Sequence, residues 1–87
     1  MKKINYTVTA EAGIHARPAG LLGKKAASFK SNIKILHEQR GSEADLKRLM
    51  AVMALGVKQG DSIVLSVDGE DEEEAADVLE AFLKENF

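Results

Sequence analysis

The chain has 87 residues, of which 45% are hydrophobic, and its formal net charge at neutral pH is −2. This length allows one domain, residues 1–87, with one small core, and the absence of cysteine excludes disulfides and thiolate chemistry. No apolar run approaches the about 18 residues of a transmembrane helix, and no signal-peptide pattern follows Met1. We therefore expect a cytoplasmic protein that does not insert into a membrane.

Charge is distributed unevenly along the chain. Residues 1–48 hold ten basic and four acidic side chains, a formal charge of +6, whereas residues 49–87 hold two basic and ten acidic ones, a charge of −8. A basic surface on the first half would attract an acidic or phosphorylated protein partner. Nucleic acid is a poor candidate ligand, because the whole chain is acidic and has only one tyrosine and three phenylalanines.

A first strand is predicted over residues 4–10, where apolar and polar residues alternate from Ile4 to Ala10. Residues 11–13 then turn the chain, and Gly13 can adopt the positive φ of a tight turn. Pro18 has its φ preset for a first helical turn and has no N–H to leave unpaired. A helix should therefore begin near Ala16, with His15 close to its N-cap.

This first helix is predicted to extend from Ala16 to about Phe29. Its apolar residues recur at helical spacing on one face: Ala19, Leu22, Ala26 and Phe29. Leu21 lies off that face, so we expect it to be part-exposed near His15, either as a residue at the edge of the core or as a docking residue.

The start of this helix is a candidate phosphate site. The first N–H groups of a helix have no intrahelical partners and lie at the positive end of its dipole, so the backbone of residues 16–18 (Ala16, Arg17 and Pro18) would bind a phosphate. The Arg17 guanidinium adds donors that match phosphate oxygens. Next to these positive groups we expect the His15 ring to be uncharged at pH 7, with a lone pair that can attack a phosphoryl donor. The arrangement indicates a histidine that carries a phosphoryl group.

The middle of the chain is predicted to form a hairpin and a short helix. The alternation of Ile33 and Ile35 indicates a second strand, residues 38–41 a hairpin turn, and residues 42–46 a third strand. A short helix is predicted over residues 47–55, with Asp45 as its N-cap and Gly56 in the left-handed conformation that ends it.

The last part of the chain is predicted to form a strand and a long helix. Residues 63–67 alternate as a fourth strand, and residues 72–86 have an apolar helical stripe made of Ala75, Ala76, Leu79, Phe82 and Leu83. The acidic run 71–74 complements the dipole at the start of that helix. The order strand, helix, strand, strand, helix, strand, helix predicts an α+β open-faced sandwich, with three helices on one face of a four-stranded antiparallel sheet.

The run Gly13-Ile14-His15-Ala16-Arg17-Pro18 resembles the active-site motif of the HPr family, the histidine-containing phosphocarriers of the bacterial phosphotransferase system. Residues 49–57 are similar to the family's second helix and residues 58–60 to the turn after it, and the likeness covers almost the whole chain. The resemblance implies the βαββαβα fold, a phosphoryl group on Nδ1 (the pros nitrogen) of His15, and its stabilisation by Arg17. It also implies that enzyme I donates this group, which comes from phosphoenolpyruvate, and that enzyme II A domains accept it. The protein would then be a monomeric carrier in sugar transport and not an enzyme, with no cofactor and no metal.

The same resemblance implies a docking surface for these partners at the start of the first helix and on the second helix. The matching positions here are Arg17, Gly20, Leu21, Lys24, Leu49, Met50 and Met53. Ordinary core packing of Met50 and Met53 is an equally good reading of their helical spacing. Arg48 stands where Gram-positive members carry a serine that a kinase phosphorylates, so that regulation should be missing. The added cation could favour an acidic partner.

Two alternatives remain at this stage. The first is an HPr-like regulatory binding protein of the nitrogen-branch or catabolite-control type; the hairpin, about two residues longer than in the sugar branch, is closer to the nitrogen branch. Intact His15 and Arg17 favour transfer over this alternative. The second is a metal site made by His15 and His37, which two histidines on separate elements support poorly. We expect His37 to be a surface residue of a strand or hairpin.

Overall fold

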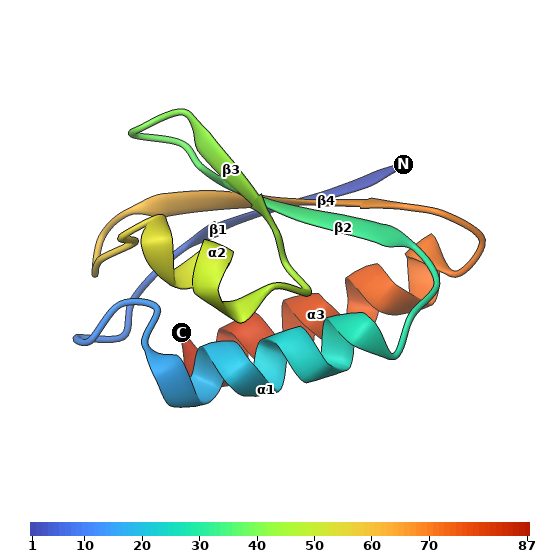
Figure 1. The fold of residues 1–87 in the computed structure, drawn as a ribbon, viewed down its shortest axis with the longest axis horizontal. Helices are drawn as coiled ribbons and strands as arrows, with labels where there is room; N and C mark the ends of the chain where they lie inside the picture. Colours follow the sequence, from blue (N-terminus) through green and yellow to red (C-terminus); the bar gives the residue numbers. More distant parts are fainter.

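Four strands form one antiparallel sheet in the order β1-β4-β2-β3, in a computed structural model that describes residues 1–87 (Figure 1). The strands are β1 (Lys2–Thr7), β2 (Asn32–His37), β3 (Ser42–Asp45) and β4 (Ser62–Asp68). The helices are α1 (Ala16–Ala27), α2 (Leu49–Ala54) and α3 (Glu72–Asn86). This element order and the sheet confirm the predicted open-faced α+β sandwich.

The core lies between the sheet and the helices, which cover one of its faces (Figure 1). Alternate residues of the central strands point into it: Ile33 and Ile35 from β2, and Ile63, Leu65 and Val67 from β4. The predicted helical stripes meet them, since Ala19, Leu22 and Ala26 of α1 and Ala75, Ala76, Leu79, Phe82 and Leu83 of α3 are buried. The period-2 and period-3.6 patterns therefore locate most of the core correctly.

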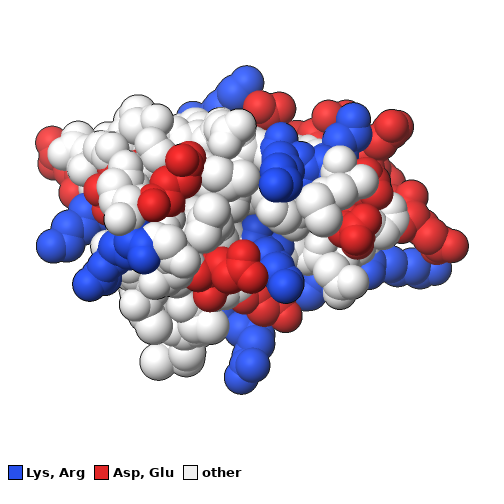
Figure 2. All heavy atoms as spheres, turned by 90° about the horizontal axis from the view of Figure 1, so that it is seen from above, with Lys and Arg blue, Asp and Glu red and all other residues white.

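The opposite face of the sheet is open to solvent, as the view from above in Figure 2 shows. Lysines and arginines are interspersed there with aspartates and glutamates and with uncharged atoms. A one-sided antiparallel sheet of this kind explains why polar and apolar residues alternate along its strands. None of the three helices is both long and apolar enough to cross a membrane.

The start of α2 differs from the prediction. The helix begins at Leu49 and not at Lys47, and Arg48 occupies the N-cap position with extended backbone angles (φ −111°, ψ 101°). Asp45 is not the cap, because its carboxylate accepts the N–H of Lys47 (2.9 Å) while its carbonyl accepts the N–H of Arg48 (3.0 Å). The Asp45 carboxylate is therefore engaged within a tight turn, and the helix begins only after this turn. Gly56 does follow the helix with φ +67°, as predicted.

Asp71 occupies the N-cap position of α3 without capping it. Its carboxylate instead accepts the N–H groups of Lys30 (2.8 Å) and Ser31 (3.0 Å) and the Ser31 hydroxyl. The buried Ser31 lies in the connection between α1 and β2. The hydrogen bonds to Asp71 therefore join this connection to the start of α3. The glutamates of the first turn, Glu72 to Glu74, remain placed to complement the helix dipole.

Candidate functional site

His15 occupies the N-cap position of α1, with extended backbone angles (φ −116°, ψ 168°). Its carbonyl accepts the N–H of Ala19 (3.0 Å), the first backbone bond of the helix. Its side chain makes no capping hydrogen bond and is exposed. The ring is therefore held by its backbone and presented to solvent, as the position of Pro18 predicted.

Two backbone donors follow the histidine. The N–H groups of Ala16 and Arg17 have no acceptor within the protein, Pro18 has no N–H, and the N–H of Ala19 is already used. The predicted phosphate site therefore has two free amides, and Pro18 contributes only its fixed backbone angle. The Arg17 side chain is exposed and forms no ion pair, so its guanidinium is available to the same anion.

The turn that leads to His15 is fixed by its contact with a second loop. Gly13 is buried with φ +64°, and its N–H donates to the carbonyl of Ala10 (2.9 Å). Ile14 is buried in the core, and its N–H donates to the carbonyl of Val57 (3.2 Å). A Cβ added to Gly13 would lie only 2.8 Å from Cα of Lys58. Glycine is therefore required here by the backbone conformation and by the close approach of residues 57–58.

Apolar side chains are exposed on α1 and α2, which contact each other. Leu21 is 50% exposed, Leu49 39% and Met50 79%. Arg17, Lys24 and Arg48 are also exposed, and Gly20 is half-buried with open space where a Cβ would point. The structure thus places these predicted docking residues on an accessible surface with basic side chains around it.

Met53 differs from the other predicted docking residues. It is only partly buried, but it packs against the hydrophobic core, whereas Met50 on the same helix is almost fully exposed. Of the two interpretations of these methionines, exposure for docking fits Met50. Core packing fits Met53, which is nevertheless partly exposed.

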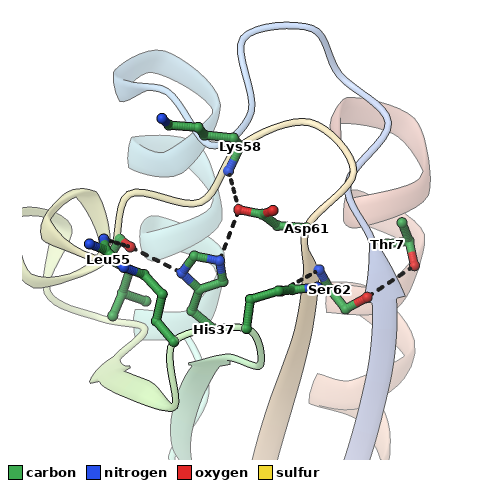
Figure 3. Close-up of polar contacts among 8 residues, drawn as sticks. Thr7, His37, Leu55, Lys58, Asp61 and Ser62 are labelled. Atoms are coloured by element: carbon green, nitrogen blue, oxygen red, sulfur yellow. Dashed lines mark hydrogen bonds and ion pairs between the residues drawn. The ribbon is translucent and has the colours of Figure 1, made fainter.

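The expectation that His37 is a surface residue is wrong. His37 is 2% exposed, at the end of β2, and both of its ring nitrogens have protein partners (Figure 3). It continues the inward alternation of Ile33 and Ile35, so the strand pattern itself was the signal that indicated burial. With both nitrogens engaged inside the protein, His37 is not available to bind a metal together with the exposed His15.

The βαββαβα sandwich, with an exposed histidine in front of its first helix, defines the class of HPr-like domains. The family described as "PTS HPr component phosphorylation site" matches residues 2–85. The chain is 41% identical over 86 residues to the phosphocarrier protein HPr of Mycoplasma pneumoniae, covering 99% of this chain and 97% of that protein. It is 44% identical over 85 residues to HPr of Lysinibacillus sphaericus, covering 98% of this chain and 94% of that protein.

A solved structure extends this comparison to three dimensions. A mycoplasma histidine-containing phosphocarrier protein superposes on this structure with a TM-score of 0.91 at 34% identity, covering 97% of this chain and 93% of that one. The chain belongs to the HPr family of the phosphotransferase system.

Proposed function

We propose that Nδ1 of His15 accepts a phosphoryl group from enzyme I and passes it to the A domain of an enzyme II. Membership of the family makes this chain a phosphocarrier of the phosphotransferase system; the residue and the two partners are the proposal. The observation that carries it is the exposed ring at the N-cap of α1, followed by two backbone N–H groups without a protein acceptor.

The transfer needs only groups that this short segment supplies. The Nδ1 lone pair of His15 attacks the phosphorus of phosphorylated enzyme I and forms an N–P bond. The bond from phosphorus to the donor atom breaks, its electron pair stays with enzyme I, and Nε2 of His15 keeps its proton. The amides of Ala16 and Arg17 and the Arg17 guanidinium stabilise the charge on the phosphoryl oxygens.

Release of the group is favoured by exposure of the site. Ion pairs and hydrogen bonds in water are worth far less than in a closed, dry cavity. Since His15 and Arg17 are both exposed, the phosphohistidine is stabilised only modestly. The second transfer then reverses the first: a nucleophile of the acceptor attacks phosphorus, and the N–P bond breaks with its electron pair returning to Nδ1.

The partners would dock on the surface formed by Leu21, Leu49 and Met50. Flexible and polarisable methionine suits a surface that must fit both a donor and an acceptor. Arg17, Lys24 and Arg48 border this surface with positive charge, which favours partners with an acidic face and raises the rate of encounter.

The test is transfer of label from phosphoenolpyruvate through enzyme I. The wild-type protein should acquire an acid-labile, alkali-stable label, and 15N NMR should place it on Nδ1. His15→Ala should abolish the label, whereas Glu80→Ala, a change at an exposed residue of α3, should leave it unchanged. Persistence of the label in His15→Ala would refute the assignment of His15. Binding of enzyme I without label would instead support the regulatory alternative, which no feature of the structure favours.

A further inference from the structure

The buried His37 ring connects two parts of the molecule (Figure 3). Nδ1 lies 3.1 Å from the carbonyl oxygen of Leu55, the C-cap residue of α2. Nε2 lies 2.8 Å from Oδ2 of Asp61, in the loop between α2 and β4. A ring on β2 therefore contacts both the C-cap of α2 and the loop that follows this helix.

Both oxygens that face the ring are acceptors. A carbonyl oxygen can only accept, and Oδ2 of Asp61 already accepts the N–H of Lys58 (2.9 Å). The Lys58 N–H in particular, and also the His37 ring, hold the pKa of the Asp61 carboxyl below its usual range. Asp61 is thus ionised near neutral pH and has no proton to donate. Each of these two oxygens can therefore only accept a hydrogen bond from the His37 ring.

The loop of residues 57–61, which contains Asp61, is hydrogen-bonded to the segment that leads to His15. Four hydrogen bonds join residues 57–61 to residues 8–14: Val8 N–H to Asp61 O (2.9 Å), Gly60 N–H to Val8 O (2.8 Å), Ile14 N–H to Val57 O (3.2 Å) and Gln59 Nε2 to Thr9 O (3.1 Å). A shift of Asp61 would therefore move the turn that precedes His15.

The other hydrogen bond of His37 reaches the helix that carries Leu49 and Met50. Leu55 is buried at the end of α2, and its carbonyl also accepts a long hydrogen bond from the Arg40 guanidinium (3.4 Å). His37 is the one side chain that is hydrogen-bonded both to the end of α2 and to the loop of residues 57–61, since the Arg40 bond reaches Leu55 alone.

We propose that His37, through its contacts with Leu55 and Asp61, is a positioning residue that fixes the His15 turn relative to α2. The inference rests on the proposed function, because the relative position matters for a donor that docks on α2 and must reach His15. His37 touches neither the phosphoryl group nor the partner, and acts through Asp61 and the loop of residues 57–61.

The test compares two phosphoryl donors on one variant. His37→Leu removes both hydrogen bonds and keeps the volume approximately. The rate of His15 phosphorylation by enzyme I should fall about tenfold, because a small misplacement of a reacting group has a large effect on rate. With phosphoramidate, a small donor that needs no docking, the rate should stay within about twofold. Leu79→Ala, a buried change in α3, is the control for lost stability and should leave both rates within about twofold under conditions where both variants are folded.

The possible results separate this inference from the proposed function. If the wild-type protein takes no label from enzyme I, the proposed function is wrong and the positioning role falls with it. If the wild-type protein is labelled and His37→Leu is labelled as fast, or is slowed equally with both donors, only the positioning role is wrong.

The position of the ring can be measured without a variant of His37. The chain has two histidines, so His15→Ala leaves His37 as the only source of imidazole signals. Nuclear Overhauser contacts of these signals should place the ring next to Leu55 and Asp61 in solution. Absence of these contacts would overturn the inference, whether or not His37→Leu folds.

Discussion

The carbonyl oxygen of Val57 accepts the N–H of Ile14 (3.2 Å) and leaves no room for a side chain on the adjacent Gly13. This contact joins the turn that presents His15 to the loop that follows α2. The position of His15 therefore depends on the backbone conformation of Gly13.

Gly13→Ala should therefore lower both stability and transfer. The residue would have to adopt φ +64° and its Cβ would overlap the backbone of Val57 and Lys58. We expect a loss of about 2 kcal/mol or more in the free energy of unfolding, measured by urea denaturation, and slower labelling of His15.

Gly20→Ala is the matched control for the change in stability. Gly20 lies inside α1, and a Cβ at this position would have nothing within 4 Å, so alanine should stabilise the protein by about 0.5–1 kcal/mol. Equal effects of the two substitutions on the free energy of unfolding would show that the close contact of Gly13 is unimportant.

Asp71 should make stability fall on the acid side. Its hydrogen bonds, chiefly from the Ser31 hydroxyl and also from the Lys30 N–H, lower its pKa in the folded protein. A group with a depressed pKa contributes stability above its unfolded pKa of about 3.9, and this contribution is lost as pH falls through the lower folded value. Asp71→Asn should therefore be less stable than wild type at pH 7, and the difference should shrink below about pH 4. A constant difference between pH 7 and pH 3 would argue against this explanation.

The order of strands and helices follows from local sequence patterns. What these patterns do not predict are the contacts of polar side chains with residues far away in the sequence. Ile33, Ile35 and Leu65 are located correctly by period-2 alternation. Asp71 does stand at the start of α3, but nothing near it in the sequence indicates that Ser31, forty residues earlier, lies beside it. Tertiary hydrogen bonds of this kind leave no periodic signal.

In the candidate site, too, the local conformation could be predicted from the sequence, whereas the distant contacts could not. Gly13 and Pro18 specify the turn and the helix start locally, so the position of His15 could be predicted from six residues. The partner of Gly13 could not, because Val57 comes from a distant loop. His37 shows a different kind of error: its place in the strand alternation indicates burial, and this pattern outweighs the usual preference of a polar side chain for the surface.

The two methionines of α2 should separate docking from packing. Met50 is 79% exposed, so Met50→Ala should change the free energy of unfolding by less than about 0.5 kcal/mol while it raises the KM for transfer from enzyme I. Met53 packs against the core, so Met53→Ala should reduce stability by about 1–2 kcal/mol. Thermal or urea unfolding and steady-state transfer measure the two effects. An unchanged KM in Met50→Ala would remove this residue from the docking surface.

Arg48 allows a test in which stability and transfer change in opposite directions. It occupies the N-cap position of α2 without a capping hydrogen bond, and it lies exposed beside Leu49 and Met50. Arg48→Ser supplies a hydroxyl that can accept an N–H of the first turn, which should raise the free energy of unfolding by about 0.5–2 kcal/mol. The same change removes a positive charge, so transfer from enzyme I should become slower although the protein is more stable.

Arg48→Glu should slow transfer further, by about three- to tenfold at low salt, because it reverses the charge toward an acidic partner. The difference from wild type should shrink as ionic strength rises, since salt screens exposed charges. Lys84→Glu, an equal charge reversal near the end of α3, is the control and should leave the rate nearly unchanged. If Arg48→Glu and Lys84→Glu slow transfer equally, net charge and not the position of Arg48 determines the encounter. A rate in Arg48→Glu equal to that of the wild type would exclude any contribution of this cation to the choice of partner.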